Sequence, residues 1–142
     1  MKLVTICIGW SMMTPEYVPG KCNIGRRGRA MRLSTGALLI ALSVTLALTV
    51  LAGNPLLRLI VGLPIYVGLL AALEGSMSFC VLHAVRGTFD LHEPKGFASS
   101  RSKTLNKVGS EEGKRLDRRK AWRMHGEAAA GAIVLSVLLA LA

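Results

Sequence analysis

The chain has 142 residues, of which 51% are hydrophobic and 18% are charged, and its formal net charge is +10. The apolar residues are grouped into three blocks and do not recur at a helix or strand period, which argues against a soluble globular domain. We therefore predict an all-α membrane protein with three transmembrane helices. Its expected parts are a basic N-terminal segment (1–32), a helical hairpin (33–85), a basic loop (86–124) and a C-terminal helix (125–142).

The first predicted span, Leu33–Gly53, holds twenty-one residues and no charge. About 20 apolar residues cross a hydrocarbon core of about 30 Å, so this block is long enough to span. Gly53 suits a helix C-cap and Pro55 suits the first turn of the next helix, which predicts a tight antiparallel hairpin. The hydroxyl groups in this block are expected to bond to backbone carbonyls one turn earlier; they belong to Ser34, Thr35, Ser43, Thr45 and Thr49.

The second predicted span, Leu56–Leu73, is followed by Glu74 and by a further apolar stretch that runs toward Val85. A single helix over Leu56–Val85 would measure about 45 Å and leave the hydrocarbon core. Pro64 is expected to kink it, because proline removes a backbone hydrogen bond and clashes with the carbonyl four residues back. Small residues spaced by four predict close helix packing; the pairs are Gly68/Ala72 and Ala71/Gly75.

Glu74 is an ionisable residue inside an apolar segment, and such residues usually face the interior of a helix bundle. One interpretation is a proton-carrying or ligand-pairing carboxylate. A second is a buried carboxyl group that is protonated or paired with Arg32 or Arg29. A third places Glu74 at the membrane interface, where the second span would end.

The third predicted span, Ala128–Ala142, has fifteen apolar residues and measures about 22 Å. Extension back through Gly126 and Glu127 makes it long enough to cross the membrane. It is apolar all round, which favours spanning over lying on the surface. Two small-residue pairs are again available for packing; they are Gly126/Ala130 and Ala128/Ala132.

Lys and Arg are distributed unevenly along the chain. Six lie in residues 1–32, one (Arg58) lies between the first two spans, and eleven lie in residues 86–124. Because positive charge accumulates on the cytoplasmic side, we expect a multi-pass protein of the bacterial inner membrane with a cytoplasmic N-terminus. Three spans then place the Asn54–Pro55 turn and the C-terminus outside.

The loop Arg86–Met124 is predicted to be basic and partly disordered. Glu93–Gly96 resembles a turn, residues 98–113 are rich in Ser, Lys and Gly, and residues 111–124 are expected to be helical. A basic cluster beside the membrane attracts anionic lipid headgroups, and Trp122 suits an interfacial anchor. The cluster consists of Lys114, Arg115, Arg118, Arg119, Lys120 and Arg123. The positive-inside bias already accounts for this charge, so we expect no nucleic-acid partner.

Cys22, Cys80 and His83 form the only group in the sequence that suggests chemistry. The predicted topology places all three at the cytoplasmic membrane surface, and Cys80 and His83 would share a face of a continuing helix. Two thiolates and an imidazole can bind a soft metal or form a redox couple, although the CxxC and HxxxH spacings are absent. His92 and His125 have no spaced partner, and no catalytic motif or cofactor site is recognised.

The segment Cys22–Arg32 reads CN-x-G-x-x-GR-x-x-R, and two apolar spans, Glu74, Cys80 and Arg86–Gly87 follow it. With these motifs, residues 22–87 resemble a family of small uncharacterised bacterial membrane proteins. They are also similar to the YgaP-type inner-membrane domain, a two-helix module. The rhodanese domain that accompanies some of those modules is absent, so the resemblance implies no sulfur transfer. It implies these pattern positions, without known roles: Cys22, Asn23, Gly25, Gly28, Arg29, Glu74, Cys80 and Gly87.

From the sequence we therefore expect a small, non-enzymatic accessory or interaction subunit. Its expected partners are anionic membrane lipids and, through the Gly and Ala helix faces, further copies or other proteins. One alternative is a redox or metal-binding membrane protein that uses Cys22, Cys80 and His83. A second alternative is an oligomeric transporter or proton carrier that uses Glu74.

Overall fold

A computed structural model describes residues 17–91 and 106–141 of the chain. Within these ranges the chain is built almost entirely from helices, joined by short turns and one pair of two-residue strands. The elements are α1 (Arg26–Thr49), α2 (Pro55–Arg58), the 3-10 helix η1 (Leu59–Val61), α3 (Gly62–Ser76), α4 (Val81–Arg86), β1 (Thr88–Phe89), β2 (Asn106–Lys107) and α5 (Glu111–Leu141).

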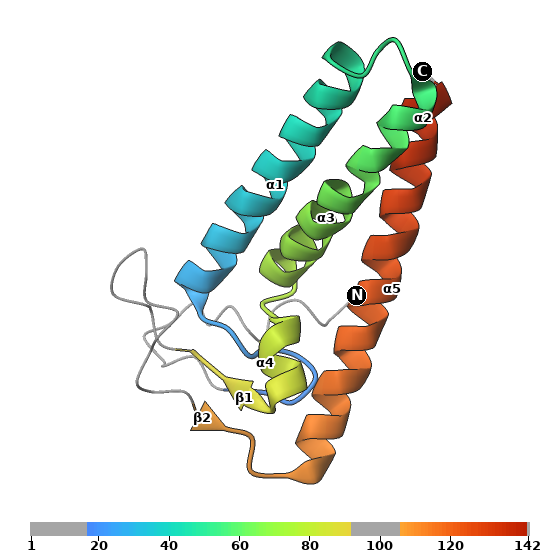
Figure 1. The fold of residues 1–142 in the computed structure, drawn as a ribbon. Coiled ribbons are helices and arrows are strands. Elements are labelled where there is room, and N and C mark those ends of the chain that lie inside the picture. The colour runs from blue at the N-terminus through green and yellow to red at the C-terminus, as the bar shows by residue number, and fades with distance from the viewer. Residues whose placement is uncertain (1–16, 92–105, 142) are drawn as a thin grey trace, which may run out of the picture.

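Three helical segments are long and apolar enough to cross a membrane: Arg26–Thr49, Pro55–Ser76 and Glu111–Leu141. Figure 1 shows them side by side, with α3 between α1 and α5 and running opposite to both. We call the end where α1 begins the basic end, and the end that carries the α1–α2 turn the hairpin end. The prediction of an all-α, multi-pass membrane protein is confirmed.

Helices α1 and α3 approach each other backbone to backbone because glycines line their contact. A Cβ atom added to Gly36 would lie 2.6 Å from the carbonyl oxygen of Gly68 and 2.7 Å from the amide nitrogen of Ala72. One added to Gly75 would lie 2.8 Å from the carbonyl oxygen of Arg29. Gly68, Ala72 and Gly75 thus perform the packing role that their spacing predicted, and Gly36 is their partner on α1.

The hairpin turn begins earlier than the sequence suggested. Helix α1 ends at Thr49 with Val50 as its C-cap, so the prediction of Gly53 as the cap is wrong. The amides of Val50 and Leu51 both donate to the Leu46 carbonyl, at 3.1 Å, and the Arg58 guanidinium binds the turn carbonyls of Leu51 and Ala52, at 3.2 and 2.6 Å. Pro55 occupies the first turn of α2 as predicted.

The second span is interrupted twice. A 3-10 turn precedes α3, and Pro64, which cannot donate to the carbonyl four residues back, lies just after it. Helix α3 then ends at Ser76, so no continuous helix runs to Val85. Ser78 adopts a left-handed conformation (φ 55°), and the Phe79 amide donates to the Glu74 carbonyl oxygen at 3.0 Å. This bond pattern is a Schellman termination, which redirects the chain into α4.

The third apolar block and the basic segment before it form one helix. Helix α5 has 31 residues, which corresponds to about 46 Å and exceeds the hydrocarbon thickness. The expected helix at 111–124 is therefore confirmed, and it continues into the span without a break. Residues 106–110, which belong to the loop predicted to be partly disordered, have a defined structure, since β2 pairs with β1 and Val108 is buried. The predicted turn Glu93–Gly96 lies outside the described residues.

A compact layer closes the basic end of the helices, as Figure 1 shows. Helix α4 packs on α5 around the buried side chains of Phe79, Ala84 and Met124. Asp117 of α5, fully buried, accepts hydrogen bonds from the Tyr17 hydroxyl at 2.8 Å and the Gly20 amide at 2.6 Å. The segment that precedes α1 is therefore fixed against α5, nearly one hundred residues later in the chain.

Candidate functional site: a polar cluster at the basic end

The ion pair of Arg32 and Glu74 is the centre of the polar cluster. Arg32 Nε donates to Glu74 Oε2 at 2.8 Å, and the other carboxylate oxygen, Oε1, accepts from the Val81 amide at 2.7 Å. The two side chains are 28% and 13% exposed. One carboxylate thus joins α1, α3 and the first turn of α4. Two interpretations of Glu74 agree with this geometry: the pairing with Arg32, and a position where the second span ends, since α3 stops two residues later at Ser76.

Asn23 fixes the chain that precedes α1 to the start of α4. Its side chain exchanges two hydrogen bonds with the Cys80 backbone: Nδ2 donates to the Cys80 carbonyl at 2.9 Å, and Oδ1 accepts from the Cys80 amide at 2.6 Å. The Asn23 amide also donates to the Ser78 carbonyl at 3.1 Å. Asn23 is completely buried, so these bonds satisfy polar groups that water cannot reach.

The Cys80 thiol is buried beside Arg32, whose Nη2 lies 3.2 Å from the sulfur. Burial raises the pKa of this thiol above its usual value, and the Arg32 charge and the amides of Leu82 and His83 only partly oppose the effect. Cys80 is therefore a neutral thiol at neutral pH. A reactive cysteine needs a thiolate and solvent access, and Cys80 has neither.

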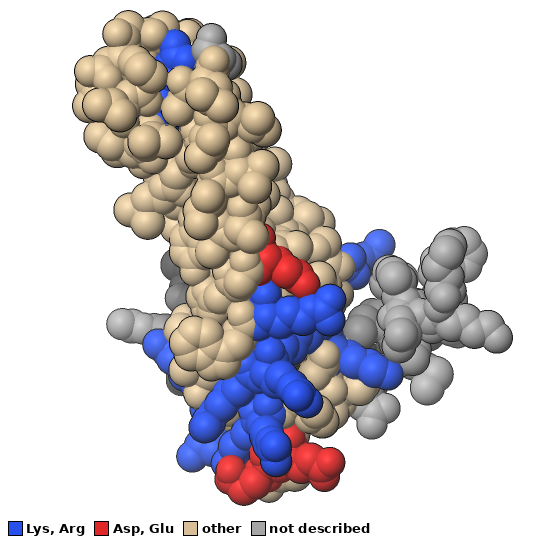
Figure 2. Space-filling model, turned by 90° about the vertical axis from the view of Figure 1, so that its right-hand side faces the viewer, with Lys and Arg blue, Asp and Glu red and all other residues tan. Residues whose placement is uncertain are grey.

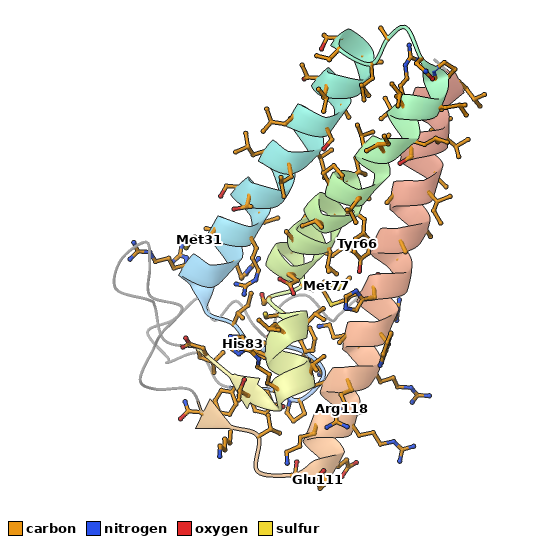
Figure 3. The ribbon with its side chains drawn as sticks, viewed as in Figure 1. Met31, Tyr66, Met77, His83, Glu111 and Arg118 are labelled. Carbon is orange, nitrogen blue, oxygen red and sulfur yellow. The ribbon has the colours of Figure 1, made fainter. Side chains whose placement is uncertain are left out.

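His83 follows Cys80 in the first turn of α4, and its ring contacts the Thr88 hydroxyl. The helix expected to carry both residues is broken, and Cys80 is the N-cap residue of α4 while His83 lies within it. Figure 3 shows His83 on α4, and its Nδ1 lies 3.0 Å from the Thr88 hydroxyl. Burial and the charges of Arg32 and Arg86 lower the pKa of His83, so the imidazole is neutral.

The described residues contain no group of three or more His, Cys, Asp or Glu side chains placed to hold a metal ion. Cys22 is buried next to Asn23, which binds Cys80, so the structure does bring the two cysteine segments together. His92 lies outside the described residues. His125 of α5 shares a hydrogen bond with the Tyr66 hydroxyl, a partner that the sequence spacing did not suggest.

The remaining pattern positions hold the same cluster in place. Gly25 permits close contact with Leu91, whose carbonyl oxygen would lie 2.5 Å from an added Cβ. Arg32 Nη1 donates to the Gly28 carbonyl at 3.2 Å, and Arg29 Nε donates to the Gly75 carbonyl at 3.1 Å. Gly87 ends α4 with a positive φ of 64°. Every one of these contacts is structural.

Sequence reasoning missed Asp117, Tyr17 and Ser78. Burial and the hydrogen bond to Asp117 raise the pKa of Tyr17. Asp117 is the only acidic residue within the basic cluster of α5, and this single negative charge among positive ones could have indicated a buried partner. Ser78 offered none, because a left-handed serine is set by its surroundings rather than by its side chain.

Basic side chains gather on α5 below its apolar half, as Figure 2 shows. Three members of the predicted headgroup cluster are already engaged: Lys114 with Glu111, Arg123 with Glu127, and Lys120 with the Lys21 carbonyl and the Phe79 ring. The exposed members without an ion pair in the described part of the chain are Arg115, Arg118 and Arg119.

Comparison with known proteins gives no match: no protein-family model, no curated protein and no solved structure is similar to this chain. The resemblance of residues 22–87 to a family of small membrane proteins stays a prediction. The fold itself shows that the chain is a multi-pass, all-α membrane protein with a polar cluster at one end of its helices.

Proposed function

We propose that the chain is a non-enzymatic interaction or accessory subunit of a bacterial inner membrane, which binds anionic lipid headgroups through α5. The observation that carries the proposal is the basic surface of α5 directly below its apolar half, where Arg115, Arg118 and Arg119 are exposed and form no ion pair with the described residues. Each Lys or Arg near an anionic surface contributes about 1 kcal/mol of attraction. A continuous helix holds these charges at a fixed height relative to the membrane.

The saturated polar cluster also supports a role without catalysis. Both oxygens of Glu74 are used by fixed partners, and the Cys80 thiol is buried and neutral. In the described part of the chain, no buried side-chain nitrogen or oxygen lacks a hydrogen-bond partner. A proton carrier or a redox centre would need a group that can change its protonation or ligand, so these alternatives have less support.

The proposed orientation has a cytoplasmic basic end and an outer hairpin end. In the described residues, Arg58 is the only Lys or Arg at the hairpin end, and its guanidinium is bound to helix carbonyls. The positive-inside rule then places the N-terminal side of α1 in the cytoplasm and the C-terminal end of α5 outside.

Single cysteines at two open glycines test this orientation. Among the described residues, a Cβ at Gly53 or at Gly109 would meet no atom within 4 Å beyond its chain neighbours, so both substitutions are sterically matched. A membrane-impermeant maleimide should label Gly53→Cys in intact cells, and it should label Gly109→Cys only after the membrane is permeabilised. The unmodified protein gives the background of its own cysteines. The reverse labelling pattern would overturn the orientation and, with it, the lipid contacts proposed for α5.

A further inference from the structure

A shallow apolar groove runs between the second span and α5. It has a volume of about 420 Å³, and its walls come from Leu59–Tyr66 on one side and Ala129–Val137 on the other. Leu63 and Ile133 are 72% and 65% exposed along its edges, so the groove is open to the surroundings of the helices. On its inner side Gly62 lies close to Ser136, whose hydroxyl oxygen would be 2.8 Å from an added Cβ.

The same face of α5 continues from the groove to two of the exposed arginines, Arg115 and Arg118. Positions three or four apart on a helix lie above one another. Counted from the basic end, the positions on this helix face are Arg115, Arg118, Trp122, Gly126, Ala129, Ile133 and Val137. The last three line the groove, the first two carry positive charge, and Trp122 between them is 76% exposed.

Gly126 leaves a passage between the charged and the apolar parts of this face. A Cβ placed there would have no atom of the described residues within 4 Å other than the local backbone. On one side of the passage, at the lower end of the groove, His125 shares its hydrogen bond with Tyr66, and Figure 3 shows Tyr66 between α3 and α5. From the basic end upward, this face therefore carries first the arginines, then the Trp122 ring, then Gly126 and finally the apolar groove.

The dimensions of this face match one membrane leaflet. Arg118 and Ile133 are fifteen residues apart, which corresponds to about 22 Å along the helix. Half of a bilayer, including its headgroups, is about 20–22 Å thick. A lipid with its phosphate at the arginines would thus end its acyl chain in the groove.

We propose that this face binds one diacyl anionic phospholipid, with its headgroup at Arg115 and Arg118 and one acyl chain in the α3–α5 groove. The inference rests on the membrane role of α5 proposed above and adds a specific site to it. Charge complementarity selects an anionic headgroup, and the hydrocarbon lining selects a chain. A soluble phosphate compound would meet the arginines but would leave the groove empty.

The test measures the lipid that the protein retains. The protein is reconstituted in vesicles of phosphatidylcholine and phosphatidylglycerol and extracted into mild detergent, and the bound phospholipid is identified by mass spectrometry. Ala129→Phe fills the groove and Gly126→Leu closes the passage; Ala41→Phe, on the exposed side of α1, is the matched control. We expect the wild type and the control to retain phosphatidylglycerol, and both groove variants to lose it.

The headgroup is tested with Arg115→Gln and Arg118→Gln, each of which should weaken the preference for phosphatidylglycerol about fivefold. Helical content checks that every variant is folded, and Gly126→Leu adds a side chain only in open space. Unchanged retention in both groove variants would overturn the lipid site while the headgroup contacts of α5 stand. A preference that survives both arginine substitutions would instead overturn the headgroup contacts themselves.

Discussion

Glu74 illustrates how one side chain can organise a membrane-protein end. Its two oxygens bind Arg32 of α1 and the Val81 amide of α4, and its own backbone carbonyl closes the turn that ends α3. Removal of the carboxylate would leave the Arg32 charge and a helix amide without these partners. Such losses cost more than the pair itself contributes, because the remaining groups stay desolvated.

At this scale we predict that Glu74→Ala lowers the free energy of unfolding by about 2–4 kcal/mol, since the pair is mostly buried. The measurement is denaturant or thermal unfolding in detergent micelles. Glu111→Ala is the control, because its pair with Lys114 lies at the start of α5 and the Glu111 side chain is 87% exposed. That change should leave the free energy of unfolding nearly unchanged. Equal losses in the two variants would contradict a special role for Glu74.

Among the helices, the contact of α1 with α3 depends on backbone proximity. Gly36 has no room for a side chain, because the backbones of Gly68 and Ala72 occupy that space. At Gly126, on the exposed side of α5, an added Cβ would meet no described atom within 4 Å apart from the local backbone. The same residue type thus has opposite roles in two helices, and the spacing of small residues does not distinguish them.

For Gly36 and Gly126 we expect opposite effects on stability from substitution by alanine. Gly36→Ala should destabilise the protein by about 1–3 kcal/mol, because it forces α1 and α3 apart. Gly126→Ala should stabilise it by up to about 1 kcal/mol through helix propensity alone. Thermal unfolding of the two variants in the same detergent measures both stability changes. A stabilised Gly36→Ala protein would show that the helices can separate without cost.

Across the whole molecule, the two ends of the helices are closed by different means. The basic end is closed by a folded layer that joins residues near 20, 80 and 117. The hairpin end is closed by Arg58, which donates to Leu51, Ala52 and, at 3.0 Å, to Leu139. Both α1 and α5 end there, so the cation also faces the negative ends of two helix dipoles.

We predict that Arg58→Ala lowers the unfolding free energy by about 3 kcal/mol, because three carbonyls lose a charged donor. Arg58→Lys should recover only part of this loss, since one ammonium group cannot reproduce the planar guanidinium fork. Unfolding in detergent measures both. Removal of the charge also strengthens the positive-inside bias, so the labelling of Gly53→Cys should not change. Wild-type stability of Arg58→Ala would refute the role of Arg58 as a cap.

By itself the sequence determined the solvent and the number of spans, and it named Arg32 and Arg29 as candidate partners of Glu74 without deciding whether Glu74 is paired. Block length and charge distribution are properties of the chain, and lipid acts on them directly. The sequence also indicated which glycines of α3 permit close packing.

Only the tertiary structure decided where the second span ends, that α5 is one helix, and that the Cys80 thiol is buried. A left-handed Ser78 is stabilised by Asn23, fifty-five residues earlier, so local propensity could not reveal it. The neutrality of Cys80 follows from burial, which depends on contacts between distant segments. The sequence likewise did not show which basic residues of α5 form ion pairs with the described residues, because that depends on their neighbours in the fold.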